Sequence, residues 1–506
     1  MRALLRTLAS AGLLAQATNA IQLTLTDEAS VKSAASTISY GLMKYYTGNR
    51  TGDVPGNLPD PYFWWEAGAM FGTLVDYWFL TGDTSYVNAT SQALLHQAGD
   101  NRDFMPTNQT RTEGNDDQGF WAMAAMSAAE NNFPDPPPDQ PQWLALVQAV
   151  FNEYAARWDT ETCGGGLRWQ IFTFNNGYNY KNSISNGCFF NIAARLARFT
   201  GNQTYADWAE KVWDWQTAVG LISPEMNIFD GASIANGANC TTKDQFQWSY
   251  NHGIFLHGAA VMYNISAAAN GSSGGGGGGK GVTTASNEAT WKQRVDGILN
   301  STLSIFFTNS IMVESACEGV GLCDNDQQSF KGYLARWMAG TTQLAPYTFD
   351  TISPLLKATA AAAAAACTGS PDSGFEGLPG TACGFRWTTG NFDGLVGVGE
   401  QMNALSAVMY TLAERVAAPV TAATGGTSVG NANAGMQSSP SSMETLRPIS
   451  TGERVGAGFF TLGVVLSVVA AVVAAEPEVT RYDTVVGDGD CGIGLKRGAE
   501  AILTAL

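Results

Sequence analysis

The chain has 506 residues, enough for one large domain with tails or for more than one average domain. Charged residues make up only 14% of it and the formal net charge is −17 at pH 7, so there is no basic excess for binding a phosphate backbone. This balance argues against nucleic acid as a partner. Aromatic residues reach 11% and include 14 Trp, and rings of this kind suit a carbohydrate cleft.

Residues 1–20 have the pattern of a secretory signal peptide. Basic residues accompany an apolar stretch that runs to Leu14, and small residues at Thr18 and Ala20 fit cleavage after Ala20. Eight Asn-X-Ser/Thr sequons follow, which indicates a glycosylated protein of the secretory pathway that reaches the cell surface. They begin at Asn49, Asn88, Asn108, Asn202, Asn239, Asn264, Asn270 and Asn300.

The cysteines predict disulfides, because the compartment is oxidising and no CxxC spacing of a zinc or redox site occurs. Two pairs would each close a short loop, Cys317 with Cys323 and Cys367 with Cys383. Three more cysteines precede the last segment and leave one thiol over, with the pairing open. They are Cys163, Cys188 and Cys240.

From about residue 26 to 417 the apolar positions recur with helical spacing, whereas strand signals are weak. Six helices are expected to start in similar contexts near Trp65, Asp117, Asn186, Asn251, Lys331 and Glu400. Amphipathic partner helices are expected at 26–47, 85–98, 141–158, 204–219, 288–307 and 345–366. Six inner helices ringed by six outer ones make an all-α fold, an (α/α)6 barrel over residues 21–417, with the inner N-termini on one face. An irregular helical domain without closure is the alternative.

The composition changes after residue 417. Residues 418–454 are rich in small and polar residues and are predicted to form a solvated stalk, because they cannot bury a core. Residues 455–475 are apolar and long enough to cross a bilayer. With the small residues before them they resemble a glycosylphosphatidylinositol attachment signal, and a single membrane span is the alternative because more chain follows. The Ser/Gly run at 271–281 is interpreted as a flexible insert.

The last segment, residues 476–506, is similar to part of the nucleotide-binding domain of dihydroxyacetone kinase. The similarity rests on the runs from Glu476 to Asp483 and from Gly487 to Gly492. In that family the aspartates hold magnesium with ATP. About thirty residues are too few for a domain of that kind, so we expect this fragment to have no function.

Two adjacent carboxylates, Asp116 and Asp117, stand just before an aromatic pair, Phe120 and Trp121. Cleavage of a glycosidic bond needs one carboxyl group that transfers a proton and another that attacks or stabilises the anomeric carbon. At the first turn of a helix that begins after Asn115, the helix dipole favours ionised carboxylates. Two such close groups cannot both ionise freely, so the pair should split into an acid and a nucleophile. An N-cap with a first-turn acid is the alternative interpretation.

The segment from Gly114 to Trp121 resembles glycoside hydrolase family 76, together with four other motifs. These are Tyr62-Phe63-Trp64-Trp65-Glu66-Ala67-Gly68, Gly165-Gly166-Leu167-Arg168-Trp169, Ser185-Asn186-Gly187 and Tyr250-Asn251-His252-Gly253. The resemblance covers residues 21–475 and implies a mannan endo-1,6-alpha-mannosidase of the lipid-anchored fungal cell-wall type. It further implies an (α/α)6 barrel and a retaining mechanism, with Asp116 as nucleophile and Asp117 as general acid/base. The implied partners are α-1,6-mannan or the mannose glycans of lipid anchors, with wall glucan as acceptor if the enzyme transfers sugars.

Further substrate-binding residues are predicted with less specific signals. Three tryptophans are candidate platforms for mannose rings, with core packing as the alternative: Trp65, Trp121 and Trp169. Three polar residues are candidates for bonding sugar hydroxyls, with helix capping as the alternative: Asn186, Asn251 and Asp393. No metal or cofactor is expected, because His252 and His257 are off the spacing of a helical zinc pair. A catalytically silent carbohydrate-binding wall protein is the alternative function.

Overall fold

The computed structural model describes residues 21–109, 111–271, 282–436, 466–479, 495–497, 499 and 501. The chain divides into one unit spanning residues 1–437 and a second spanning residues 438–506. The predicted signal peptide and residues 272–281 of the Ser/Gly run lie outside the described residues.

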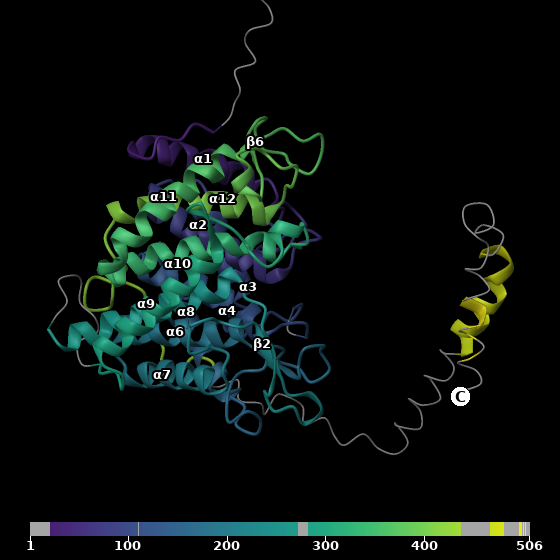
Figure 1. Ribbon diagram of the computed structural model, residues 1–506, viewed down its shortest axis with the longest axis horizontal. Helices are drawn as coiled ribbons and strands as arrows, with labels where there is room; N and C mark the ends of the chain where they lie inside the picture. The colour runs from purple at the N-terminus through teal and green to yellow at the C-terminus, as the bar shows by residue number, and fades with distance from the viewer. Residues whose placement is uncertain are drawn as a thin grey trace, which may run out of the picture. The chain divides into compact units, whose positions relative to one another are not determined.

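Six helices of the first unit, which are labelled in Figure 1, form a closed ring of contacts. Along the chain each packs against the next, from α2 to α12, and α12 also contacts α2. These inner helices are buried on nearly all sides; in α6, every residue from Ser183 to Phe199 is buried. The six are α2 (Trp64–Thr81), α4 (Asn115–Glu130), α6 (Ser183–Thr200), α8 (Ser249–Ala269), α10 (Phe330–Leu344) and α12 (Val398–Met409).

The other α-helices described in this unit bury one side only. In α7, Ala206, Ala209 and Trp213 are buried at helical spacing, while Lys211 and Asp214 face solvent. These outer helices are α1 (Glu28–Met43), α3 (Val87–Gln97), α5 (Trp143–Ala156), α7 (Gln203–Ala218), α9 (Glu288–Phe306) and α11 (Phe349–Ala365). The predicted all-α fold is confirmed, and the inner and outer helices begin within a few residues of their expected positions.

Short strands sit in the connections between helices. One antiparallel sheet has the order β1 (Tyr180–Asn182), β2 (Gly231–Ser233) and β3 (Thr242–Asp244). Because β1 ends where α6 begins, this sheet fixes the entry of the chain into an inner helix. Two smaller sheets pair β4 (Phe307–Thr308) with β5 (Ile311–Met312) and β6 (Cys367–Gly369) with β7 (Ala382–Cys383). Because the strands are this short, the sequence shows little of the alternation between apolar and polar residues that is typical of strands.

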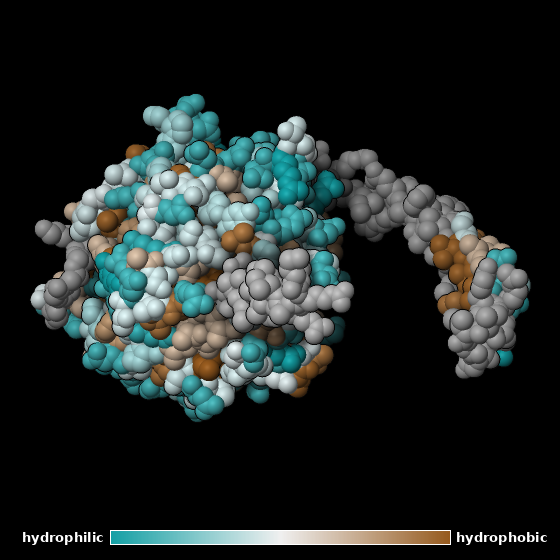
Figure 2. All heavy atoms as spheres, turned by 90° about the horizontal axis from the view of Figure 1, so that it is seen from above, coloured by the Kyte–Doolittle hydropathy of each residue, from teal (hydrophilic) through white to brown (hydrophobic). Residues whose placement is uncertain are grey.

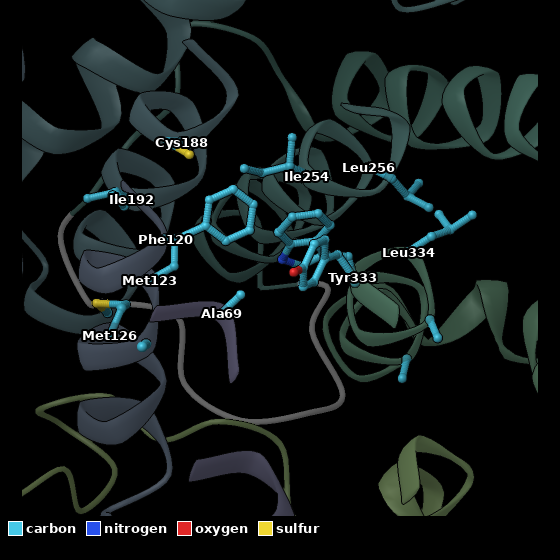
Figure 3. Packing of buried hydrophobic residues seen from close by; sticks show 14 of the residues in the cluster. Ala69, Phe120, Met123, Met126, Cys188, Ile192, Ile254, Leu256, Tyr333 and Leu334 are labelled. Carbon is cyan, nitrogen blue, oxygen red and sulfur yellow. The ribbon is translucent and has the colours of Figure 1, made fainter. Parts of the chain in front are cut away.

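The core of the first unit fills the interior of the helical ring. Phe120 of α4 and Tyr333 of α10 meet there, with ring centroids 5.2 Å apart (Figure 3). α2 and α4 approach closely at Gly68, where an added Cβ would stand 2.9 Å from the Trp121 ring. The face seen in Figure 2 is mostly hydrophilic with scattered hydrophobic residues, as expected when the large apolar side chains are inside.

Both predicted disulfides, Cys317–Cys323 and Cys367–Cys383, are present. The pairing left open by the sequence is Cys163 with Cys240, which closes a loop with a sequence separation of 77 residues. The thiol left over is Cys188, which is buried in α6.

The stalk prediction is wrong for residues 418–436, which belong to the first unit and are hydrogen-bonded to its helices. Arg198 donates from Nη2 to the Pro419 carbonyl over 2.9 Å, and Ser428 Oγ accepts from the Leu144 N–H over 3.0 Å. Asn152 donates from Nδ2 to the Ala432 carbonyl over 2.9 Å. The segment has few apolar side chains, but its backbone carbonyls accept hydrogen bonds from polar side chains of the helices. Composition does not reveal bonds of this kind. Residues 437–454 of the predicted stalk lie outside the described residues.

The second unit is described only in part. Residues 466–479 form a helix, which covers the end of the predicted apolar tail and the first residues of the kinase-like fragment. None of the helices in the described part of the chain has the length and apolarity needed to cross a membrane. Residues 455–465 and most of 476–506 fall outside the described residues.

One of the eight sequons lies in the core. Asn264 in α8 is 6% exposed, accepts from Arg198 Nε over 3.1 Å and donates to the Leu344 carbonyl over 3.2 Å. A glycan on this side chain would break both bonds and would have no room. The prediction of glycosylation at Asn264 therefore does not fit the folded domain.

Candidate active site

Asp116 and Asp117 occupy the first turn of α4, as expected, although the helix begins one residue earlier, with Gly114 as its N-cap. The Gly114 N–H donates to Asp117 Oδ2 over 2.7 Å, which orients that carboxylate. Asn115 anchors the turn from the other side, because its N–H bonds the Trp169 carbonyl over 2.8 Å. The helix start is therefore fixed to the segment that carries Trp169.

Asp116 has different hydrogen-bond partners. Its Oδ1 accepts from the Asp117 N–H over 3.1 Å, and its Oδ2 accepts from Asn182 Nδ2 over 3.2 Å. Asn182 is also the N-cap of α6, where its Oδ1 accepts from the Ser185 N–H over 3.3 Å. One side chain thus joins the starts of two inner helices at the carboxylate pair. The sequence analysis missed Asn182, although an Asn just before a helix is a readable signal.

The two carboxylates line a pocket of about 220 Å³. Its wall comes from segments at or just before the starts of α2, α4, α6, α8 and α10, so five of the six inner N-termini converge on one site, and α12 contributes no lining residue. The lining residues are Trp65, Asp116, Asp117, Phe120, Trp169, Tyr180, Asn182, Ile184, Asp230, Trp248, Tyr250, Asp326, Gln327 and Phe330.

Burial makes the pocket carboxyl groups hold protons more tightly than in water. Burial, followed by the charge of Asp117, raises the pKa of Asp116 well above its usual range. Burial raises the pKa of Asp117 to about 7, against the opposing effect of the Gly114 N–H and with an added contribution from Asp326. The pair can therefore hold one shared proton near neutral pH, which is the state an acid and a nucleophile require.

Two further carboxylates, Asp230 and Asp326, face the same pocket and were missed by the sequence analysis. Asp326 Oδ1 accepts from Trp65 Nε1 over 3.2 Å, and Asp230 Oδ2 accepts from the Tyr180 hydroxyl over 2.7 Å. Burial raises the pKa of each of these aspartates to about 6. Both lie in connections before inner helices, and no spacing in the sequence ties them to the Asp pair.

Trp65 and Trp169 lie at the pocket, as predicted. Trp65 packs against Phe120 with ring centroids 4.7 Å apart. Trp169 is 37% exposed and meets Tyr180 edge-on at 6.5 Å. Both rings can therefore present a surface to a sugar in this pocket.

Trp121 and Asn186 do not reach the pocket, which contradicts the predictions made for them. Trp121 has no exposed surface and stacks on Trp64 at 5.3 Å, because it points to the side of α4 away from the pocket. Asn186 is fully buried and makes two bonds to the Leu167 backbone, accepting from its N–H over 2.8 Å and donating to its carbonyl over 3.0 Å. It anchors the segment before Trp169 and has no face toward a sugar.

Asn251 and Asp393 also lie outside the pocket lining, contrary to prediction. Asn251 is fully buried in α8, and neither of its side-chain polar atoms has a hydrogen-bond partner among the described residues. Asp393 accepts from the backbone N–H groups of Arg386 and Leu395 over 2.8 and 3.1 Å, so it shapes its own loop. Proximity to a helix start does not specify which way a side chain points, because the directions of successive side chains differ by about 100° around the helix axis.

Comparison with known proteins supports a carbohydrate site. The family model for glycosyl hydrolase family 76 matches residues 30–423. The chain is 46% identical over 455 residues to mannan endo-1,6-alpha-mannosidase DCW1 of Saccharomyces cerevisiae, an alignment that covers 90% of this chain and 94% of that protein. It is 45% identical to mannan endo-1,6-alpha-mannosidase DFG5 of the same yeast, covering 90% and 93% of the two chains.

Solved structures give the same result. Dfg5 from Chaetomium thermophilum, solved in complex with glucosamine, superposes with a TM-score of 0.75 and 45% identity, covering 83% of this chain and 99% of that one. An inactive variant of an α-1,6-mannanase from Salegentibacter, in complex with α-1,6-mannotriose, matches with a TM-score of 0.56 and 16% identity, over 76% of this chain and 99% of that one. At this lower identity the match shows a shared fold only.

Proposed function

The chain belongs to glycosyl hydrolase family 76, and we infer that it is a mannan endo-1,6-alpha-mannosidase, a glycosidase that cleaves α-1,6-linked mannose in cell-wall glycans. The yeast relatives that carry this name cover nine-tenths of the chain, at 45–46% identity. We also interpret the closed ring of inner helices with its outer layer as an (α/α)6 barrel. The observation that carries the assignment is the Asp116–Asp117 pair inside an aromatic-walled pocket.

We propose a retaining mechanism with Asp116 as the nucleophile. Its two carboxylate oxygens accept N–H bonds from Asp117 and Asn182, and these bonds oppose the rise that burial causes in the pKa of Asp116. With the one proton of the pair on Asp117, Asp116 is ionised for attack on the anomeric carbon. Asp117 then protonates the leaving oxygen, and later deprotonates the water or sugar hydroxyl that releases the mannose from Asp116. The carboxyl groups of neighbouring residues can approach the ~5 Å separation that a retaining mechanism requires.

Trapping the covalent intermediate tests this mechanism. A fluorinated mannosyl substrate that reacts quickly but is released slowly should add one sugar mass to the protein, located on Asp116 by peptide mass spectrometry. The anomeric configuration of the first product, followed by NMR, should be retained. Inversion of configuration, or a label on a residue outside the pocket, would refute the assignment.

Four carboxylates in one pocket suit a sugar that carries an amine. Asp230 and Asp326 are placed beside the Asp pair, and at a pH above their pKa values they attract a cationic group. We therefore propose that the substrate is the mannose glycan of a lipid anchor, in addition to α-1,6-mannan, and that these carboxylates bind an amino sugar next to the mannose. Support comes from the Chaetomium relative, which was solved with glucosamine.

Whether water or a wall glucan accepts the mannose decides between hydrolysis and transglycosylation. We propose that the enzyme works at the cell surface, held by a lipid anchor or a single span. Incubation of an anchor-type glycan with and without a glucan acceptor, followed by product analysis, separates hydrolysis from transfer. Release from membranes by a phosphatidylinositol-specific phospholipase is expected, and retention of unmodified protein would favour the membrane span.

A further inference from the structure

A continuous aromatic wall leads from the pocket to the protein surface. Tyr250 and Phe330 line the pocket and stack with ring centroids 3.8 Å apart and an interplanar angle of 7°. Trp248, also in the lining, meets Phe330 edge-on at 6.0 Å. Phe246 then stacks on Trp248 at 5.8 Å with an angle of 20°.

Phe246 is the outermost ring of this wall, and its side chain is 58% exposed to solvent. Its backbone is held on both sides, since its N–H bonds Asp244 Oδ1 and its carbonyl accepts from the Asp230 N–H, each over 2.9 Å. One face of the ring is backed by Trp248, and the exposed part is therefore a flat aromatic surface that is already in position. Binding to such a surface costs little side-chain entropy.

We propose that Phe246 is the stacking platform of an outer sugar subsite, which takes a saccharide unit beyond those held in the pocket. The inference rests on the proposed function, because its ligand is a chain of α-1,6-linked mannose. The apolar face of a pyranose ring matches an aromatic ring in size and shape. A lipid surface or a protein partner would need a far larger apolar patch than a single ring.

Binding measurements on glycans of two lengths test the subsite. In a protein carrying Asp117→Asn to stop turnover, Phe246→Ala should weaken the binding of α-1,6-mannohexaose by about fivefold to tenfold, the effect of losing one aromatic contact. Binding of α-1,6-mannobiose should be unchanged, because in this proposal its two units occupy the pocket and not the outer subsite. Phe246→Trp should restore the affinity for the longer glycan.

Phe174 provides a matched control. It is 67% exposed and is backed by Phe172 at 5.5 Å and 16°, yet neither ring lines the pocket. Phe174→Ala should leave both affinities unchanged. Equal effects of Phe246→Ala on the two glycans, or no effect on either, would overturn the outer subsite and leave the proposed function standing. A protein that binds neither glycan before Phe246 is altered would overturn both.

Discussion

Asp116 and Asp117 differ in their hydrogen-bond partners, and this difference suits different roles in one reaction. Asp116→Asn should remove the nucleophile and Asp117→Asn the proton donor, so each should lower kcat on an α-1,6-mannan oligosaccharide by about 10³-fold or more. Both variants should still bind the glycan, because the aromatic walls remain. Wild-type activity in both variants would show that the Asp pair is not catalytic, whereas binding without turnover in the unaltered protein would favour a carbohydrate-binding protein.

Asn182 should act on catalysis through Asp116, as a positioning residue. Its Nδ2 bond to Asp116 Oδ2, 3.2 Å long, stabilises the ionised carboxylate, so Asn182→Ala should raise the pKa of Asp116 still further. Because attack needs ionised Asp116, the acid limb of the kcat profile should move to higher pH. The pH dependence of kcat measures this shift.

The loss of a helix cap needs its own control, since Asn182 also caps α6. Asn287 caps α9 in the same way, accepting from the Thr290 N–H over 2.9 Å, and lies outside the pocket lining. Both Asn→Ala variants should lose about 1 kcal/mol of stability, but only Asn182→Ala should move the pH profile. An unchanged profile would limit Asn182 to a capping role.

Individual side chains were predicted unevenly from the sequence. The Asp pair has a specific motif, and it lines the pocket together with Trp65 and Trp169, whose roles toward a sugar stay predictions. Trp121 was misplaced because the sequence gives its helix but not the direction in which its side chain points. Asp230 and Asp326 were missed because only the closure of the ring brings them to the pocket, across long sequence separations.

At the level of elements, residues 418–436 should contribute to the stability of the domain. The Pro419 carbonyl accepts a hydrogen bond from the guanidinium of Arg198, which is only 2% exposed. The Val420 N–H donates to the Glu130 carbonyl over 2.9 Å. A chain ending at residue 417 would leave a buried guanidinium without these acceptors, a loss of about 1–3 kcal/mol or more. It should therefore unfold at a lower temperature than a chain ending at residue 436, as calorimetry can measure. Equal melting temperatures would show that the segment only lies on the surface.

The elements themselves were predictable, because helical periodicity runs strongly from residue 26 to 417. The strands were not, since pieces of two or three residues such as β4 carry no pattern. Residues 418–436 were misjudged for a related reason. Their attachment depends on backbone carbonyls and on Asn152 and Arg198 of distant helices, whereas composition reports only their own side chains.

At the scale of the whole molecule, buried carboxyl groups should make the fold more stable on the acid side of neutral. Burial raises the pKa values of Glu66, Asp103 and Glu314 to about 8. The folded state therefore binds these protons more tightly than the unfolded chain, whose carboxyl groups titrate near 4. Their contribution to stability is full at low pH and is lost as the pH rises toward their folded pKa values.

Buried histidines oppose this trend, but in a different pH window. Burial lowers the pKa of His252 to about 3 and that of His257 well below its usual value. The folded state thus binds fewer of these protons than the unfolded chain, and the histidines' own contribution to stability falls as the pH drops through about 6.5. As the pH rises from about 6.5 to about 8 the unfolded histidines lose their remaining protons, so their opposing effect fades. Lys181, whose pKa burial lowers to about 8, opposes the trend only near the upper end, and the three carboxyl groups outweigh it.

The melting temperature should therefore fall as the pH is raised from about 6.5 to about 8, by several degrees if each of the three carboxyl groups contributes about 1 kcal/mol. Glu314→Gln should flatten the slope, because the amide keeps the shape of a side chain that accepts from the Ser249 N–H over 3.1 Å but cannot titrate. Calorimetry of both proteins at matched ionic strength measures the difference. A melting temperature that stays level or rises across this window would mean that these carboxyl groups are ionised in the folded protein, and hence that the interior holding the catalytic pair is more hydrated than its burial indicates.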